Sequence, residues 1–472
     1  MSATEALAPL RKPRRKARSN WLTNALSQRA IFAVSAGFVV LVSLMGGGSR
    51  DDIASLVLLR PLSVLACFYG WLALSQQDDA KATRRVAAML LALGAIALLQ
   101  LVPLPPAVWQ ALPGRALHAE IATALGMGEQ WRPLSFSPVK TLNMLFALAT
   151  PLAGILLFGA LEPENLRRIW LLVLALGGVS MVLALLQLAG SPSGPAYLYR
   201  ITSEGYAVGL FANRNHFAVH LALLGPLASV FALEGKSVSL ARLTVLLGAM
   251  ALAALLVLAS GSRAGLICLA LALPFASWLM RDGLAKQKWP ERFIWLAPPL
   301  VAALALVLAL MTGTASAWQR LAGQDGMGHR GTILPTLWRM AQDTFPAGAG
   351  FGSFARAWPQ WESDELAQPN YLNQAHNDWL QWVIEGGLPG LLWLGGALAL
   401  LARLGWRRWR DGNPAQRSAS RALIAVIALL ALASAADYPL RTPIMMLLLA
   451  LAVTSLAIPN SLTCGEKQCP AR

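Results

Sequence analysis

Charged side chains are scarce in this sequence. Asp, Glu, Lys and Arg make up 13% of its 472 residues, whereas 56% of the residues are hydrophobic. A soluble globular protein would carry roughly 25% charged residues. The hydrophobic residues also gather in long runs. Both features argue against a soluble domain and predict an integral membrane protein.

Cysteine is rare as well, and its placement excludes two classes of small domain. The sequence has four cysteines, two in hydrophobic runs and two near its end: Cys67, Cys268, Cys464 and Cys469. This distribution is not that of a disulfide framework. No second pair accompanies Cys464 and Cys469, so a zinc site is not expected there.

Twelve stretches are long and hydrophobic enough to cross a membrane, since a transmembrane helix needs about 20 mostly apolar residues. The first follows the basic stretch "RKPRRKARSN" and has no small-residue cleavage site after it, so we expect a retained helix rather than a signal peptide. The predicted membrane helices are residues 30–47, 53–76, 86–103, 141–160, 167–189, 216–233, 241–260, 264–280, 294–313, 378–402, 422–436 and 442–458.

Lysine and arginine divide unevenly between the two sides of this topology. With the N-terminus in the cytoplasm, the inner segments hold 26 of the 39 basic residues and the outer segments hold 12. Cytoplasmic loops are normally the richer in Lys and Arg, so the count supports this orientation, with both termini in the cytoplasm. The net charge of +16 then faces anionic lipid at the inner leaflet, and a nucleic-acid partner is not expected.

Two of the predicted outer segments have patterns of their own. Residues 104–140 show a short amphipathic helical pattern between prolines, and residues 314–377 form the largest loop, which is rich in Trp, Gly and Arg. Loops of this length are usually functional. All five histidines also fall on the outer side, where we therefore expect the chemistry. The predicted parts are a basic cytoplasmic tail (1–29), helices one to nine (30–313), the large periplasmic loop (314–377), helices ten to twelve (378–458) and a cytoplasmic tail (459–472).

Three arginines are candidates for binding an anion. Arg263, in the hairpin "GSRAG", either clamps a phosphate with its guanidinium fork or extends to the lipid headgroups. Arg60 lies about two turns inside the second helix, beside Pro61, and either forms an internal ion pair or binds an anion. Arg330 precedes an amphipathic helical pattern in the large loop, where the alternative is an ordinary solvated charge.

The stretch "GLFANRNHFAVH", residues 209–220, precedes the sixth predicted helix. Asn213 and Asn215 can cap that helix. His216 and His220 are four residues apart and share a helix face, which is a metal-ligand spacing, but no third ligand accompanies them. We therefore favour a polar cluster that hydrogen-bonds a sugar or a phosphate.

The stretch "QAHNDWLQWVIEGG", residues 374–387, opens the tenth predicted helix. Asn377 or Asp378 can cap the helix, and His376 stands just outside its first turn. His376 is either a surface histidine beside an ordinary cap or a catalytic group at the membrane surface. Histidine is well suited to take or orient a proton near neutral pH. Because the other candidates converge on the same face, we favour the catalytic interpretation.

Four motifs in this order resemble the O-antigen ligase-like superfamily of bacterial membrane proteins. They are "GLFANRNHFA" (209–218), "SGSRAG" (260–265), "HRGTILPTLWRMAQDTFPAGAGFGSF" (329–354) and "AHNDWLQWVIEGGLPGLL" (375–392). The twelve-helix layout and the large outer loop before the tenth helix are similar too. The resemblance covers residues 30–460.

The resemblance implies an all-α polytopic fold like that of the membrane-embedded GT-C glycosyltransferases, in the bacterial inner membrane. Members take a glycan from an undecaprenyl diphosphate carrier on the periplasmic side and need no metal, cofactor or nucleotide sugar. Arg263 and Arg330 match the arginines assigned to the diphosphate, and His376 matches the histidine that activates or orients the acceptor hydroxyl. Weaker candidates for substrate binding are Arg60, Asn213, Asn215, His216 and Asn377.

Three functions remain open from the sequence. The first is an O-antigen ligase of lipopolysaccharide biosynthesis, which transfers polymerised O-antigen to the lipid A core. The second is a polymerase that extends an O-antigen or exopolysaccharide chain by the same inverting chemistry. The third is a transporter. Transporters usually place polar residues near the midplane of the membrane, whereas the candidates here, apart from Arg60, cluster at the outer edge. An enzyme is therefore favoured over a transporter.

Overall fold

The structure is a computed structural model that describes residues 24–233, 239–285, 327–366 and 372–459, together with Leu296, Ala303 and Leu462. The described residues are mostly helical, with almost no strand, and include ten helical segments long and apolar enough to cross a membrane. These segments are α2 (Gln28–Met45), α3 (Leu56–Ser75), α4 (Lys81–Leu99), the consecutive pair α7 (Pro138–Ala147) and α8 (Ala149–Gly159), α9 (Pro163–Ala189), α10 (Arg214–Ala232), α11 (Leu240–Ser260), α12 (Arg263–Ala285), α17 (Asp378–Asp411) and α18 (Pro414–Ala433).

The prediction of an all-α, multi-pass membrane protein is confirmed. The ten segments, with the shorter apolar helix α19 (Pro443–Ala457), fall on eleven of the twelve predicted hydrophobic stretches. The remaining predicted stretch, residues 294–313, lies outside the described residues apart from Leu296 and Ala303.

Local sequence explains where most of these helices begin. Several start with proline in the first turn, where its missing N–H leaves no hydrogen bond unmade. Others begin after a side chain that accepts a hydrogen bond from a free backbone N–H, as Ser27 and Ser239 do. The helices with proline in the first turn are α7, α9, α18 and α19.

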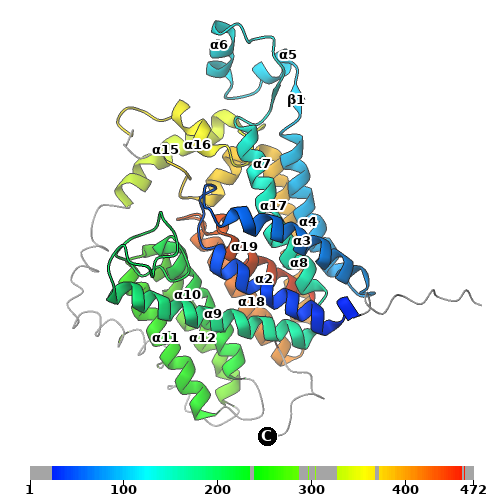
Figure 1. Cartoon of the computed structure of the whole chain (residues 1–472), viewed down its shortest axis with the longest axis vertical. Coiled ribbons are helices and arrows are strands. Elements are labelled where there is room, and N and C mark those ends of the chain that lie inside the picture. The colour runs from blue at the N-terminus through cyan, green and yellow to red at the C-terminus, as the bar shows by residue number, and fades with distance from the viewer. Residues whose placement is uncertain are drawn as a thin grey trace, which may run out of the picture.

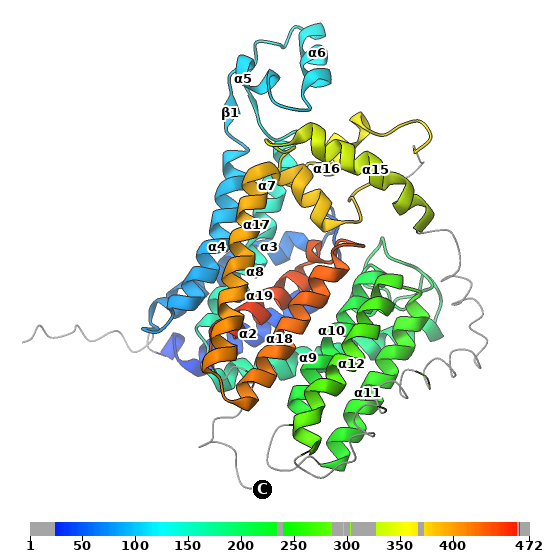
Figure 2. The same cartoon turned by 180° about the vertical axis from the view of Figure 1, so that it is seen from behind.

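The membrane helices pack around α10 on one side and α8 on the other (Figures 1 and 2). α10 contacts α11, α12 and α18, whereas α8 contacts α3, α4 and α19. Small residues permit the closest approaches: a Cβ added at Gly265 of α12 would lie 2.3 Å from Ala218 Cβ of α10. The indole of Trp170 in α9 donates a 2.9 Å hydrogen bond to the Ser455 hydroxyl in α19, which ties the two sides together.

A layer of short elements covers one end of the bundle (Figures 1 and 2). One part projects outward and comprises β1 (Pro103–Leu104), α5 (Pro106–Gln110), α6 (Ala116–Ala124) and β2 (Arg132–Pro133), with the two strands paired antiparallel. The other part comprises α15 (Met327–Thr344), α16 (Phe354–Ala357) and the 3-10 turn η1 (Trp358–Gln360). The amphipathic helical pattern expected after Arg330 is confirmed, but the helix, α15, already includes Arg330. Its Ile333 and Leu337 pack in one core with Leu380 and Ile384 of α17.

α17 is bent inside its length, and a loop fills the bend. Gly387 has φ = 54° and ψ = −148°, which interrupts the helix and frees backbone carbonyl groups before it. N–H groups of the loop 346–352 satisfy two of them: Ala349 donates to Ile384 O (2.7 Å) and Gly350 donates to Glu385 O (3.0 Å). From the sequence, the glycine pair at 386–387 would permit close approach of another helix. The close neighbour is instead this loop.

Candidate functional site

Three chain segments meet at the end of the bundle below the outer layer. The start of α10, the start of α17 and the turn after α18 supply Asn215, His376 and Asp437. The Asp437 side chain is 1% exposed and contacts both others. Its Oδ1 lies 3.3 Å from His376 Nδ1, and its Oδ2 accepts a 2.7 Å hydrogen bond from Asn215 Nδ2. A buried carboxylate requires such partners, so Asp437 holds the two helix starts at one point.

The backbone of His376 has an uncommon conformation, with φ = 52°. Few non-glycine residues adopt the left-handed region, and where they do, surrounding contacts must hold them. Here the Asp437 carboxylate engages Nδ1, and the ring of Tyr438 lies 4.8 Å from the imidazole, centroid to centroid. The side chain is 22% exposed. An acidic acceptor on Nδ1 favours the tautomer in which Nε2 carries the lone pair.

Two predicted asparagines act as helix caps at this point. Asn377 Oδ1 accepts a 3.0 Å hydrogen bond from the Leu380 N–H, and Asn213 Oδ1 accepts one of 2.8 Å from the Asn215 N–H. Both bonds use N–H groups that a helix leaves unpaired at its start. Asn377 directly follows His376, and Asn213 bonds the N–H of Asn215, so the caps help to fix the positions of the two residues that contact Asp437.

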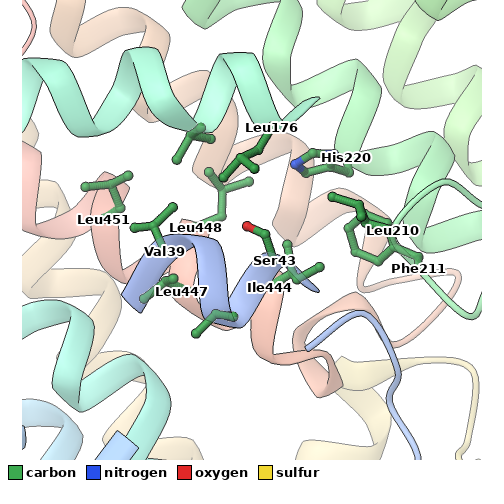
Figure 3. Close-up of a pocket in the computed structure, with 12 residues that line it drawn as sticks. Val39, Ser43, Leu176, Leu210, Phe211, His220, Ile444, Leu447, Leu448 and Leu451 are labelled. Carbon is green, nitrogen blue, oxygen red and sulfur yellow. The ribbon is translucent and has the colours of Figure 1, made fainter. Parts of the chain in front are cut away.

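The two histidines of α10 face different neighbours. His216 is buried edge-on against Tyr438, with ring centroids 5.2 Å apart, and therefore lies beside the His376 cluster. His220 packs near Phe211, and Figure 3 shows its ring nitrogen directed into a small cavity of about 30 Å³ whose lining includes Ser43. Within the described ranges, no group of three His, Cys, Asp or Glu side chains is arranged to hold a metal ion.

A buried ion-pair network lies next to His376. Arg441, in the 3-10 turn η2 (Pro439–Arg441), donates from Nε to Asp378 Oδ1 and from Nη2 to Glu385 Oε2, each at 3.3 Å. The fully buried Glu385 also accepts a 3.1 Å hydrogen bond from the Phe354 N–H. Burial alone would lower the pKa of Arg441, but the carboxylates of Glu385 and Asp378 raise it above its usual value. Arg441 therefore stays charged and joins α17, α19 and the outer layer.

Arg263 lies at the same end of the bundle as His376. It is the first residue of α12, which runs antiparallel to α18: Cys268 Sγ donates to Leu429 O at 3.7 Å. Arg263 is five positions before Cys268, and Ser434 is five positions after Leu429. The Ser434 carbonyl accepts a 2.8 Å hydrogen bond from the N–H of Asp378, the first residue of α17. Because helices rise by the same amount per residue, Arg263 and the start of α17 are at similar height.

Arg330 is the fourth residue of α15, and its side chain lies outside the described part of the structure. The helix that carries it packs against the first turns of α17 through Ile333, one turn further along the chain. The structure therefore places the backbone at Arg330 within the outer layer.

Arg60 is separate from the His376 cluster. Because α3 begins at Leu56, Arg60 lies about one turn inside the helix rather than two. It lines a hollow of about 440 Å³ together with Asp51 and Asp52. Those carboxylates form ion pairs with Lys140 and Arg50, so the internal ion pair considered for Arg60 is not formed within the described ranges. Its Nε has no hydrogen-bond partner there.

Sequence reasoning missed Asp437, Tyr438 and Arg441. All three lie in "SAADYPLRTP", residues 434–443, between two hydrophobic stretches. An acid and a base in so short a hairpin between membrane helices are unusual, because ionisable groups at membrane depth need partners. That signal was available, but the partners are far away along the chain: His376 is 61 residues from Asp437, and Asn215 is 222 residues from it.

The cluster can act as a base at the membrane boundary. A partly exposed imidazole with its Nδ1 on a buried carboxylate can accept a proton at Nε2, since the carboxylate stabilises the resulting cation. An arginine at the same end can counter negative charge on a bound group. The arrangement therefore suits attack by a hydroxyl group on a substrate with an anionic leaving group.

Comparison with known families gives one match. The family model described as O-antigen ligase matches residues 248–395, from within α11 to within α17. The matched range includes Arg263, Arg330 and His376 and leaves out Asn215 and Asp437. No curated protein matches the chain.

Proposed function

We propose that the chain, whose residues 248–395 match the O-antigen ligase family, is a membrane glycosyltransferase that moves a glycan from undecaprenyl diphosphate to an acceptor hydroxyl. The proposed acceptor is the lipid A core, which makes the chain an O-antigen ligase at the periplasmic face of the inner membrane. The observation that carries the proposal is the His376–Asp437 pair, a partly exposed imidazole held by a buried carboxylate at the end of an apolar bundle.

In the proposed reaction, His376 Nε2 accepts the proton of the acceptor hydroxyl. The acceptor oxygen forms a bond to the anomeric carbon, and the bond from that carbon to the diphosphate oxygen breaks. Attack from the side opposite the diphosphate inverts the anomeric centre. Asp437 Oδ1, 3.3 Å from Nδ1, stabilises the imidazolium that results.

The diphosphate leaves with the lipid, and its negative charge must be countered. We assign Arg263 and Arg330 to this role because guanidinium groups pair with phosphate oxygens through two parallel hydrogen bonds. Fixed cations of this kind stabilise charge as it develops on a leaving group. The proposed chemistry therefore requires no metal and no cofactor. The polyprenyl tail stays in the bilayer, which explains a site at the membrane boundary.

The test is the lipopolysaccharide profile of a strain that lacks this chain and is complemented with the wild type or with His376→Ala. We expect the wild type to restore O-antigen on the core. We expect His376→Ala to leave a bare core, with long O-antigen chains accumulating on the lipid carrier. Immunoblots of membrane fractions check that both proteins are present at equal levels.

Other profiles contradict the ligase assignment. A core carrying a single repeat in the deletion strain would identify a polymerase of the same superfamily. A normal lipopolysaccharide profile with altered secreted polysaccharide would identify an exopolysaccharide polymerase. If both were normal, the glycosyltransferase proposal would fail and the transporter alternative would be taken up.

A further inference from the structure

The projecting part of the outer layer contains a second group of basic side chains, away from His376. Arg115 precedes α6, His118 lies in its first turn, and Arg132 lies in β2. Gln360 reaches this group from η1, where its Nε2 donates a 3.1 Å hydrogen bond to the Gly114 carbonyl. Figures 1 and 2 show this part at the extreme end of the molecule. We call these four side chains the Arg115 cluster.

Among the residues that the structure describes, the buried Arg115 guanidinium has no counter-charge. The residue is 5% exposed, and its guanidinium carbon lies 3.7 Å from the centroid of the Phe136 ring. Nε and Nη2 are both buried and have no hydrogen-bond partner among the described residues. Burying a cation without acceptors is costly. Burial correspondingly lowers the pKa of Arg115 to about 10.

The neighbours of Arg115 leave further polar atoms unmatched. His118 packs edge-on against the same Phe136 ring at 4.6 Å, and its buried Nδ1 has no partner in the described ranges. The same holds for Gln360 Oε1. Burial lowers the pKa of His118, the charges of Arg115 and Arg132 lower it further, and a hydrogen bond with the Gln360 side chain acts in the opposite direction. Like charges so placed repel each other unless an anion lies between them.

In the described part of the structure, no acidic side chain of the outer layer forms an ion pair with Arg115, and this includes Glu120 of α6 and Glu129 before β2. Glu362 Oε1 accepts a 2.9 Å hydrogen bond from the Trp358 indole, and Asp343 Oδ2 accepts one of 2.8 Å from the Trp361 indole. Neither carboxylate forms an ion pair with Arg115. The acceptor that Arg115 needs is therefore to be supplied from outside the described chain.

We propose that the Arg115 cluster binds an oxyanion, a phosphate or a carboxylate, carried on a saccharide. The guanidinium fork of Arg115 supplies paired donors for two oxygen atoms. Arg132, whose guanidinium stacks on Trp109 at 5.2 Å, supplies a second positive charge. Gln360 Oε1 accepts a hydrogen bond from a neighbouring hydroxyl. A sugar bearing an acidic group offers both kinds of partner at once.

Aromatic surface around the cluster favours a sugar over a free ion. Phe136 and Trp361 lie 6.4 Å apart at the cluster, and Trp131, next to Arg132, is 64% exposed. Aromatic rings with one accessible face provide flat apolar area against which the C–H face of a sugar ring can pack. A free inorganic ion makes no use of such area.

The cluster is joined to the segment that carries His376. The Phe136 N–H donates a 2.8 Å hydrogen bond to Ala349 O, and the Ala349 N–H donates one of 2.7 Å to Ile384 O in α17. Phe136 also packs against the core that contains Ala375. The identification of the saccharide as part of the transferred glycan or its acceptor rests on the proposed function. The binding of a sugar-borne oxyanion does not.

Calorimetric titration of the full chain in detergent tests the proposal. The probes are glucose 6-phosphate, glucuronate, inorganic phosphate and neutral glucose. The background is the double variant Arg263→Gln, Arg330→Gln, which removes both arginines assigned to the diphosphate. We expect an acidic sugar to bind and Arg115→Gln to weaken it about tenfold or more, because hydrogen bonds to a charged group are lost. We also expect neutral glucose to bind the unchanged cluster at least about tenfold more weakly than the acidic sugar does.

Matched variants separate the possible outcomes. Arg356→Gln removes an exposed arginine of α16 in the same layer, and we expect it to leave binding unchanged. If Arg115→Gln does not fold, Arg132→Gln, at a less buried position, is expected to weaken binding severalfold. Equal affinities in the wild type and both cluster variants would overturn the proposal. Inorganic phosphate binding as tightly as the acidic sugars would overturn its saccharide part.

The titration tests the Arg115 cluster whether or not the proposed glycosyltransferase function is correct. His376→Ala is expected to abolish transfer and to leave the affinity for the acidic sugar unchanged. If His376→Ala were fully active, the catalytic assignment would fail while the titration still decided the Arg115 cluster. If transfer required His376 but no variant changed sugar binding, only the Arg115 proposal would fail.

Discussion

At the scale of the residue, Asp437 determines what His376 can do. A carboxylate only accepts hydrogen bonds, so the proton of the neutral imidazole is held at Nδ1 and the lone pair stays at Nε2. Asn215 occupies the other carboxylate oxygen at 2.7 Å and prevents the side chain from turning away. The pair therefore has a direction: Nδ1 holds the proton, and Nε2 is the ring nitrogen that can accept one.

Replacing Asp437 by asparagine should reverse that direction. The amide group of Asp437→Asn can donate to Nδ1, which would then carry the lone pair and leave the proton at Nε2. We expect the rate of glycan transfer to fall about 10²–10⁴-fold, with the protein still folded because shape and volume are kept. The measurement is the transfer rate of the purified full chain with a lipid-linked donor.

Asp411→Asn is the matched control for this change. Asp411 is a surface residue at the far end of α17, paired with Arg410 at 2.7 Å. Its replacement changes the same chemical group where no ring depends on it, and the rate should be that of the wild type. Wild-type transfer by Asp437→Asn would show that the hydrogen bond to His376 is dispensable.

Single residues were predictable from the sequence only where a local pattern marked them. His376 and Asn377 stand at the entrance of a hydrophobic stretch, and Arg263 interrupts one, so each was conspicuous by contrast. Asp437 owes its role to contacts with α10 and α17. No rule of local spacing connects positions so far apart in the chain, and the pairing became visible only in the folded structure.

At the scale of the element, the bend in α17 is the feature that joins the membrane bundle to the outer layer. The loop 346–352 takes the place of the next helical turn and donates its N–H groups to α17. A Cβ added at Gly387 would lie 2.3 Å from Pro346 O. The bend therefore depends on glycine for both backbone conformation and space.

Gly387→Ala should destabilise the protein by about 1–3 kcal/mol or more, because alanine is strained at this φ and clashes with the loop. The measurement is the melting temperature of the full chain in detergent, which we expect to fall by several degrees. Gly395→Ala is the control in the same helix. A Cβ there meets nothing within 4 Å, and a helical alanine is favoured over glycine by up to about 1 kcal/mol. Equal melting temperatures of the two variants would refute the structural role of the bend.

Helices were the part of the fold that the sequence predicted well. Length and hydropathy identify a membrane span because the bilayer imposes both. The two-part span of α7 and α8, the bend at Gly387 and the β1–β2 ribbon were not foreseen, since each depends on contacts made by other segments. From the sequence alone, the stretch "GLPG" at 387–390 predicts only an ordinary interruption of the helix. The loop that packs into the interruption is seen only in the structure.

At the scale of the whole molecule, the two ends of the bundle differ in what they carry. The His376 cluster and the outer layer occupy one end, while the last turn of α17, with Arg408 and Arg410, lies at the other. The distribution of basic residues predicts that the His376 end faces the periplasm and the other end the cytoplasm.

Cysteine labelling in spheroplasts should reveal this orientation. In a chain whose four native cysteines are replaced by serine, Arg356→Cys in α16 should react with a membrane-impermeant maleimide. Arg410→Cys, at a side chain that is 66% exposed, should react only after the membrane is permeabilised. The reverse pattern would invert the topology and remove the periplasmic site. Full labelling of both positions before permeabilisation would contradict the membrane-spanning arrangement itself.

The separation of the site among three segments also has a consequence for how the protein is made. Ribosomes deliver the chain from its N-terminus, so Asn215 enters the membrane first and Asp437 last, 222 residues later. Until α18 has been inserted and the turn after it formed, His376 has no carboxylate and the starts of α10 and α17 have no common anchor. If the cluster is the catalytic centre that we propose, the nascent protein is expected to be inactive through most of its synthesis and to become active only when the final hairpin enters the bilayer.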